Sequence, residues 1–331
     1  MAFYSYFFTA NYKGFFRSLS QVAKKEKRFF PWLLMDAGFC VFRYGMGMQD
    51  YLNYKIYLRN AKERQEYVSI RVSNEFYEEV SPSKYKKRYT VKPNFLREFR
   101  DYTKREFLVP EEGNFAQFDD FLNRNAGFMA KPYDGLAGQD VRKLVTADIT
   151  DREAFFRECI ENRVFVEELV IQHPEMNVLC AGSVNTIRIM TFNNHGKPEI
   201  LWLGMRVGNG INAVDNFHAQ GMGVSIDLQT GRFVGNALDK DGVEFEYHPT
   251  SGVKFDGFQI PYFQEAVDMV LRACLESDKI LVVGWDVAIS ENGPLLIEGN
   301  RRPGFDLVQM LDGRGRKDML RHVLKCVREE K

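Results

Sequence analysis

The chain has 331 residues and a formal net charge of zero, with 45 basic residues (Lys and Arg) against 45 acidic ones (Asp and Glu). This length predicts about two domains with room for a hydrophobic core, and the charge balance argues against a protein that binds nucleic acid through an extended basic surface. Hydrophobic residues make up 45% of the chain and charged residues 27%, which excludes general disorder and predicts a globular protein.

The cysteines lie far apart in the sequence and form no metal-binding pattern. They are Cys40, Cys159, Cys180, Cys274 and Cys326. An odd number without close pairs indicates a reducing compartment. The N-terminal residues also lack the charged start and the cleavage site of a secretion signal. We therefore expect a cytoplasmic protein.

The first part of the chain predicts helices. Residues 1 to about 80 carry aromatic and aliphatic residues at spacings of three and four, with few glycines, which is typical of several short helices. The longest apolar stretch, residues 29–42, is too short to cross a bilayer and contains Asp36. Its composition favours a buried helix, and the alternative is a helix that contacts a membrane surface.

A basic run follows this helical part. The lysines and arginines from Lys84 to Lys92 have no acid among them and are interleaved with Tyr85 and Tyr89. This pattern indicates a boundary with a local positive patch, or an ordinary solvated face. The aromatic spacing that begins after it, at residue 95, predicts a helix that ends before Pro110.

From Gly113 to Gly304 the sequence changes to strands, glycines and short helices, which predicts an α+β region. The predicted strands cover residues 128–132, 163–170, 183–192, 198–207, 280–290 and 296–300. A glycine-bearing loop follows the first of these strands, and a helix opened by Pro261 precedes the last two. The residues that carry chemistry fall on these strands and their ends.

Oxygen-bearing side chains on the last two predicted strands form the strongest candidate site. Glu298 and Asn300 point to one face of their strand, together with Leu296, because strand side chains alternate. Two carboxylates and an amide oxygen suit Mg²⁺, which prefers hard oxygen ligands and completes its shell with phosphate oxygens. If Asp286 joins this face, the three side chains therefore predict a magnesium site, and the alternative is a pair of solvated acids.

Whether Asp286 joins them depends on the connecting turn. A two-residue turn at Asn292-Gly293 would pair residue 287 with Glu298 and send Asp286 to the other side of the sheet. A three-residue loop, 291–293, with its glycine in the left-handed region, pairs Asp286 with Glu298. We expect the three-residue loop.

Basic residues on the other predicted strands supply the positive charge that a phosphate site needs. Lys131 lies at a strand end before Gly135 and Gly138, and a glycine-bearing loop lets backbone N–H groups approach phosphate oxygens. Arg188 and Arg206 lie on two consecutive strands, where guanidinium groups bind phosphoryl or carboxylate oxygens. An ordinary hairpin and cross-strand ion pairs are the alternatives. The histidine spacing predicts no zinc site, and no cysteine or serine motif indicates a nucleophile.

The order of these parts resembles the ATP-grasp superfamily. More narrowly, four segments look like the sugar-transfer-associated ATP-grasp family, which is found with polysaccharide biosynthesis. They are Val166-Glu-Glu-Leu-Val-Ile-Gln-His, Ser183-Val-Asn-Thr-Ile-Arg, Val283-Gly-Trp-Asp-Val-Ala and Ile297-Glu-Gly-Asn. The resemblance covers about residues 90 to 305. It implies an α+β ATP-grasp fold, in which two subdomains grip ATP, after a mainly helical N-terminal region.

The resemblance also implies a role for each candidate residue. The phosphates of ATP would meet Lys92, Lys131, Gly135 and Gly138. Adenine would meet Glu168, Leu169 and Val170, and the ribose would meet Gln172, His173 or Glu175. The catalytic cations would be Lys131, Arg188 and Arg206, and the acceptor side would include Asn185, Arg206, Asn216 and Gly221. The Mg²⁺ ligands would be Asp286, Glu298 and Asn300.

The implied organisation has three parts. Residues 1–90 would form a helical region with an acceptor-binding or lid role, residues 91–170 the first ATP-grasp subdomain, and residues 171–331 the second. The implied activity is that of an ATP- and Mg²⁺-dependent carboxylate–amine ligase, which joins an amino acid or amine to a carboxylated sugar or glycan precursor through an acyl phosphate. The alternatives are a kinase that phosphorylates a sugar hydroxyl and a non-catalytic nucleotide-binding scaffold in a polysaccharide assembly complex. We expect no transmembrane segment, with peripheral association with membrane-bound glycan assembly.

Overall fold

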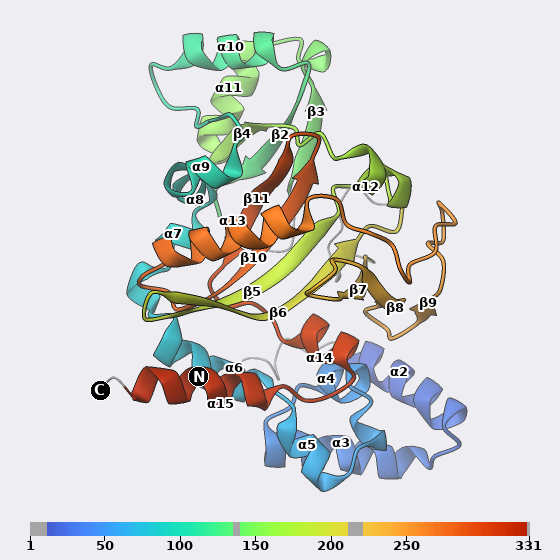
Figure 1. The fold of residues 1–331 in the computed structure, drawn as a ribbon. Helices are drawn as coiled ribbons and strands as arrows, with labels where there is room; N and C mark the ends of the chain where they lie inside the picture. Colours follow the sequence, from blue (N-terminus) through green and yellow to red (C-terminus); the bar gives the residue numbers. More distant parts are fainter. Residues whose placement is uncertain (1–11, 135–139, 211–220, 330–331) are drawn as a thin grey trace. The chain divides into compact units, whose positions relative to one another are not determined.

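The computed structural model describes residues 12–134, 140–210 and 221–329, which form two compact units (Figure 1). The first unit comprises Met1–Pro82, Lys240–Val243 and Gly304–Lys331, and the second comprises Ser83–Asp239 and Glu244–Pro303. The helical unit therefore ends before residue 90, and it also contains the last part of the predicted 171–331 subdomain. Within the first unit, the C-terminal segment packs with the N-terminal helices.

The first unit is helical throughout its described elements, as the apolar spacing predicts. These are α2 (Tyr12–Lys25), α3 (Phe30–Tyr44), α4 (Met48–Asn53), η1 (Ile56–Leu58), α5 (Ala61–Glu66), α6 (Ile70–Val80), α14 (Asp306–Asp312) and α15 (Lys317–Arg328). Local sequence sets some of their ends. The Asn60 side chain accepts hydrogen bonds from the backbone N–H groups of Lys62 and Glu63, and the Glu63 carboxylate accepts from the N–H of Asn60 (2.8 Å). This reciprocal cap starts α5.

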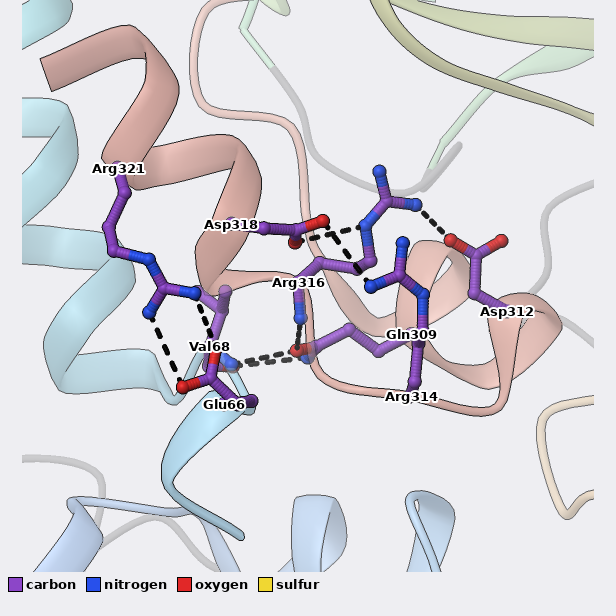
Figure 2. Close-up of polar contacts among 8 residues, drawn as sticks. All are labelled: Glu66, Val68, Gln309, Asp312, Arg314, Arg316, Asp318 and Arg321. Atoms are coloured by element: carbon purple, nitrogen blue, oxygen red, sulfur yellow. Dashed lines mark hydrogen bonds and ion pairs between the residues drawn. The ribbon is translucent and has the colours of Figure 1, made fainter. Parts of the chain in front are cut away.

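Two distant segments join inside this unit through Gln309 on α14. Its buried side chain accepts from the backbone N–H of Val68 (2.7 Å) and donates to the carbonyl of the same residue (3.2 Å). It also accepts from the N–H of Arg316 (3.3 Å), and Figure 2 shows these bonds beside the ion pair of Arg321 with Glu66 (2.6 Å). The C-terminal helices are therefore tied to the segment before α6.

Helix α3 differs from the sequence expectation of a buried helix. One of its faces is buried, at Leu33, Ala37 and Cys40. The opposite face leaves Met35 74% and Phe42 81% exposed, so that expectation is wrong for half of the helix. No helix in the described part of the chain is long and apolar enough to cross a membrane.

The smaller sheet of the second unit has four strands in the order β1-β4-β2-β3. These are β1 (Phe107–Leu108), β2 (Gly127–Pro132), β3 (Arg142–Val145) and β4 (Val164–Glu168). Helices α10 (Phe115–Arg124) and α11 (Arg152–Glu161) pack against it through a phenylalanine-rich core, with the short helix η3 (Thr146–Asp148) between β3 and α11. All of its strand pairs are antiparallel.

The helix predicted to run on to Pro110 is interrupted. The chain instead forms η2 (Ser83–Tyr85), α7 (Lys87–Thr90), α8 (Lys92–Glu98) and α9 (Arg100–Thr103). Lys104 follows in the left-handed region (φ 50°), and Phe107 then pairs with Glu167 at the edge of the smaller sheet. Pairing with β4 satisfies the backbone there, and sequence spacing gives no sign of a partner 60 residues away.

The larger sheet of the second unit has seven strands in the order β11-β10-β5-β6-β7-β8-β9. These are β5 (Thr186–Asn194), β6 (Lys197–Val207), β7 (Met222–Ile226), β8 (Phe233–Asp239), β9 (Glu244–Phe245), β10 (Val282–Ser290) and β11 (Gly293–Asn300). Helix α12 (Pro174–Leu179) precedes β5, and α13 (Phe263–Glu276) lies across the sheet in Figure 1. The side chains between α13 and the sheet form the main core of the unit.

Candidate functional site

Asp286 and Glu298 lie opposite each other on β10 and β11. The next pair along these strands joins Val287 to Leu296, so Ile297 is an extra residue on β11. Such an insertion is a β-bulge, which reverses the alternation of the bulged strand. The predicted pairing of Asp286 with Glu298 is thus confirmed, and the bulge produces it.

The predicted connecting loop is wrong. Ser290 pairs with Gly293, so the loop contains only Glu291 and Asn292. Gly293 has the expected positive φ (95°), but it is the first residue of β11. The bulge also moves Leu296 away from the face of Glu298 and into the hydrophobic core, so the expectation that Leu296 shares this face is wrong as well.

Asn300 completes the predicted group of oxygen-bearing residues. Its side-chain nitrogen donates to Glu298 Oε1 (3.1 Å) and lies 3.5 Å from Asp286 Oδ2. Burial raises the pKa of Glu298, and the charge of Asp286 raises it further. The three side chains that the sequence selected are therefore in contact.

Two arginines from neighbouring strands bind Asp286. Arg188 on β5 is directly opposite Asp286 and forms two bonds with its carboxylate, one of them from Nη2 to Oδ2 at 3.0 Å. Arg206 on β6 donates from Nη1 to Oδ2 at 2.9 Å. Burial by itself would raise the pKa of Asp286, but the two guanidinium charges outweigh it and lower the pKa to about 2. The arginine strands and the acidic strands thus form one charge cluster.

Lys131 on β2 forms an ion pair with Glu167 on β4. Glu167 is 3% exposed, and its other carboxylate oxygen lies 3.7 Å from Arg105 Nη2. Burial would raise the pKa of Glu167, yet Lys131 and Arg105 hold it below its usual range. Arg105 also donates to the carbonyl of Leu296 (2.8 Å), which links the smaller sheet to β11. Sequence reasoning missed Glu167 and Arg105, although a charged residue inside the buried run of β4 is itself a signal.

A cavity of about 410 Å³ in the second unit is lined by Lys131 and Glu167 and by Glu298 and Asn300. Its walls are Tyr89, Thr90, Lys92, Phe95, Leu96, Lys131, Asp134, Phe165, Glu167, Ile297, Glu298, Gly299, Asn300, Arg301 and Arg302. The volume lies within the range of about 300–1,000 Å³ for small-molecule pockets. Four residues predicted separately from the sequence, Lys92, Lys131, Glu298 and Asn300, thus line one cavity. Apolar side chains such as Phe95 and Phe165 form part of the same walls.

Lys92 lies in this cavity at the start of α8. Pro93 follows it at a position where a helix accepts proline, because the first turn needs no donor from that residue. Burial lowers the pKa of Lys92, the charge of nearby Lys131 also lowers it, and the charge of Glu298 opposes them. Lys92 and Lys131 are therefore close enough to each other and to the carboxylate of Glu298, a predicted metal ligand, to interact electrostatically.

Gln172 and Asn185 have roles inside the protein. The Gln172 side chain accepts from the backbone N–H of Asn185 (2.6 Å) and donates to Asn177 (2.9 Å) and to the carbonyl of Cys180 (3.0 Å). Asn185 is fully buried, and its side chain accepts from the N–H of Gly208 (3.2 Å). These bonds give both side chains a structural role, and the predicted contacts of Gln172 with the ribose and of Asn185 with the substrate stay predictions.

The remaining candidates stay predictions. Glu168 ends β4 and accepts from the N–H of Glu106 (3.2 Å), and Leu169 and Val170 follow it. His173 caps α12 by accepting from the N–H of Glu175 (3.2 Å). Gly221 is buried just before β7. Gly135, Gly138 and Asn216 lie outside the described residues.

The donor set at β10 and β11 fits Mg²⁺. It offers two carboxylates and an amide, which is fewer than the three His, Cys, Asp or Glu side chains of a dedicated metal cage, and no such cage occurs among the described residues. Mg²⁺ binds with one or two carboxylates and takes the rest of its shell from water and phosphate. A divalent cation would also relieve the repulsion that raises the pKa of Glu298. Rotating the Asn300 amide would present its oxygen in place of its nitrogen.

Two antiparallel sheets, with Lys131 on one and Glu298 and Asn300 on the other lining one cavity, are the arrangement expected of an ATP-grasp protein. A profile of the sugar-transfer associated ATP-grasp family matches residues 107–325. The chain belongs to this family, and the fold predicted from the sequence is confirmed.

Solved structures resemble the chain at low identity. The ATP-grasp ligase PsnB complexed with minimal precursor is 15% identical, with a TM-score of 0.46, over 75% of this chain and 64% of that one. The D-alanine-D-alanine ligase from Coxiella burnetii is 11% identical, with a TM-score of 0.44, over 73% and 59%. The D-alanyl-alanine synthetase A from Vibrio cholerae is 12% identical, with a TM-score of 0.42, over 73% and 64%.

The chain thus spans less than two thirds of the length of these proteins. Among curated protein sequences, none matches the chain.

Proposed function

We propose that the protein is an ATP- and Mg²⁺-dependent ligase that joins the carboxyl group of a sugar or glycan precursor to an amine or amino acid. The family description, sugar-transfer associated, supports a sugar or glycan substrate, and we place the reaction in cell-surface polysaccharide biosynthesis as part of this proposal. A free carboxylate is too poor an electrophile to form an amide. The γ-phosphoryl group of ATP would therefore convert it to an acyl phosphate, which the amine then attacks.

The observation that carries this proposal is the cavity lined by Lys92 and Lys131 together with Glu298 and Asn300. Lysines bind phosphate oxygens as point charges, and the carboxylates would hold Mg²⁺ beside them. A site with cations and a metal position close together is suited to a polyphosphate, since each negative oxygen finds a positive partner. Asp286, Glu298 and Asn300 would hold the metal, and the metal would neutralise part of the phosphate charge.

The chain's own residues position charge in this scheme. Glu167 orients Lys131, and Asp286 orients Arg188 and Arg206 at fixed places next to Glu298. Such preorganised cations stabilise the charge that develops during phosphoryl transfer without moving at the moment of reaction. No protein nucleophile takes part, which agrees with the sequence.

The reaction is tested by following the oxygen atoms of the carboxylate. The protein is incubated with ATP, Mg²⁺ and uronic acids, with and without amino acids, and release of ADP is measured. For the acid that gives ADP, ¹⁸O placed in its carboxylate should appear in the released phosphate, and hydroxylamine should trap a hydroxamate.

The two other functions give different results. A kinase on the same scaffold would form a stable phosphorylated sugar, and no ¹⁸O would reach free phosphate. A non-catalytic scaffold would bind ATP and release no ADP with any acid. Either result would overturn the ligase proposal.

A further inference from the structure

Helix α3 in the first unit has two apolar faces, and only one of them is buried. The buried face contains Leu33, Ala37, Cys40, Val41 and Tyr44. The other carries Trp32, Met35, Phe39 and Phe42, which are 43%, 74%, 55% and 81% exposed. Their spacing of three, four and three residues places them in a single stripe along the helix.

This stripe differs from the outer face of an ordinary surface helix, which carries charged and polar residues. Phe29, just before the helix, is 73% exposed, and Phe16 on the neighbouring helix α2 is 43% exposed. Figure 1 shows α2 and α3 joined by a short turn. We call Phe29, Trp32, Met35, Phe39 and Phe42 the apolar stripe. A contiguous exposed apolar surface of this kind marks a site of interaction.

Basic residues flank both ends of the apolar stripe. Lys24, Lys25, Lys27 and Arg28 precede it, and Arg43 follows it. The guanidinium group of Arg28 lies over the ring of Trp32, 5.4 Å from its centre. From Tyr12 to Tyr44 the chain has seven lysines and arginines against two acids.

The acid within α3 does not offset this charge. Asp36 is engaged on its own side of the helix by Arg64, at 2.6 Å, and by the hydroxyl of Tyr51, at 2.8 Å. Its side chain is 11% exposed. The exposed side of α2 and α3 therefore combines an aromatic stripe with net positive charge.

We propose that the apolar stripe docks on an anionic lipid bilayer, with α3 lying in the plane of the interface. Aromatic and aliphatic side chains on one face and lysines and arginines around them are the pattern of interfacial helices. The basic residues would meet lipid phosphates, and Trp32 would sit at the headgroup level. At 15 residues, α3 is roughly 22 Å long, shorter than the hydrocarbon core of about 30 Å, so it lies on the membrane and does not cross it.

The charge distribution argues against a second copy of the chain as the occupant. A two-fold contact brings the same face of both copies together. Because basic residues stand at both ends of the stripe, either antiparallel or parallel packing of two α3 helices would place like charges next to each other. A lipid surface of opposite charge has no such cost. The inference rests on the first unit alone and is independent of the proposed reaction.

The test measures binding of the full chain to sedimented vesicles. Phosphatidylcholine vesicles with phosphatidylglycerol should bind the wild-type protein, and phosphatidylcholine alone should bind it much less. Added salt should weaken binding because it screens the lysines. Absence of binding to the anionic vesicles would overturn the proposal.

Two variants locate the contact. Phe39→Ser/Phe42→Ser should weaken binding by roughly tenfold or more, since each ring leaves water when it docks, whereas Tyr247→Ser, at a residue 52% exposed in the second unit, should not. Lys24→Gln/Lys25→Gln should weaken binding about fivefold for each charge removed. Lys143→Gln/Lys197→Gln, which removes two exposed lysines of the second unit, is the matched control.

Each variant is first checked for an unchanged thermal midpoint and circular dichroism spectrum. If the phenylalanine double variant is destabilised, the result for the lysine double variant decides the test. Folded variants of both kinds that bind like the wild type would overturn the proposal. So would a dimer in sedimentation equilibrium that Phe39→Ser/Phe42→Ser converts to monomer while wild-type protein ignores vesicles. That outcome would assign the stripe to a contact between copies.

Discussion

Glu298 lies directly opposite Asp286 on two antiparallel strands, yet the two carboxyl groups have opposite electrostatic surroundings. Burial would raise the pKa of both. For Asp286, Arg188 and Arg206 reverse that effect and lower the pKa to about 2. For Glu298, the charge of Asp286 adds to burial and raises the pKa. Asp286 is therefore held in its ionised form, whereas a cation bound beside Glu298 would favour the ionisation of that residue.

Replacing Glu298 by glutamine tests this assignment. The neutral amide keeps the size and removes the charge, so Glu298→Gln should reduce Mg²⁺-dependent ADP formation by at least about 100-fold, since even the outer partners of metal ligands cost about 10–100-fold. Stability should be retained, because the variant removes a buried acid whose charged form is disfavoured. Glu291→Gln, at an exposed turn residue on the same hairpin, is the control. Full activity of Glu298→Gln at saturating ATP would contradict the metal assignment.

The pairing of Asp286 with Glu298 shows where sequence reasoning succeeds and where it stops. Alternation in a strand predicts that Glu298 and Asn300 share a face, and this depends only on local geometry. The bulge at Ile297 has no local signature, because it satisfies two demands at once: Leu296 enters the core with Val287, and Glu298 faces the cavity. The loop is one residue shorter than predicted, and the bulge adds one residue to β11. The two differences cancel, so Asp286 still pairs with Glu298.

Partners distant in sequence determine other contacts of the site. Arg188 and Arg206 both contact Asp286, 98 and 80 residues away, and their predicted role at a phosphate stays a prediction. Such contacts follow from strand order, which no single strand encodes. The exposure of α3 was missed for a related reason, since composition shows that a helix is apolar but does not show how many of its faces are covered.

Because of the carboxyl group of Asp50, on α4, we expect the free energy of unfolding to depend on pH. Burial raises its pKa to about 6, and the bond from the backbone N–H of Gly47 (3.0 Å) only partly opposes this. The unfolded chain has a pKa of about 3.9 at this group. The folded state therefore holds the proton more tightly between about pH 4 and pH 6, so the free energy of unfolding falls as pH rises through that window, by at most about 3 kcal/mol.

The variant Asp50→Asn removes this titration while its amide oxygen still accepts a hydrogen bond. In urea unfolding of the full chain, wild type and variant should have similar stability near about pH 4, and the variant should be the more stable one above about pH 7. Asp120→Asn, at an exposed residue of α10, controls for the loss of one surface carboxyl. Parallel pH profiles for wild type and Asp50→Asn would show that burial of this acid costs nothing.

Gln309 offers a separate test of the first unit. Gln309→Leu keeps the volume but leaves the backbone N–H and carbonyl of Val68 without their partner, so the unit should lose about 2–6 kcal/mol, at about 1–3 for each of these two unsatisfied groups. Hydrogen exchange at the amide of Val68 should accelerate accordingly. Gln264→Leu, at an exposed helical glutamine, should change stability by less than about 0.5 kcal/mol. Unchanged protection at Val68 would mean that water replaces the side chain.

The ion pair of Lys131 with Glu167 allows the ligand role of the lysine to be separated from its structural role. Lys131→Ala should weaken ATP binding roughly 10- to 100-fold, since a charged hydrogen bond contributes about 1.5–3 kcal/mol, while adenosine binding stays unchanged. It should also destabilise the protein by about 1–3 kcal/mol, because Glu167 keeps only Arg105 as a partner. Lys143→Ala, at an exposed lysine on the neighbouring strand, should affect neither.

The double variant Lys131→Ala/Glu167→Gln distinguishes the two roles. Neutralising Glu167 removes the buried charge that the first substitution leaves under-compensated, so thermal stability should return toward the wild-type value. ATP affinity should stay low, because the phosphate contact is still missing. Recovery of both properties together, or an equal loss of ATP and adenosine in Lys131→Ala, would mean that the lysine acts only by holding β2 to β4, and that the phosphates are bound by other residues.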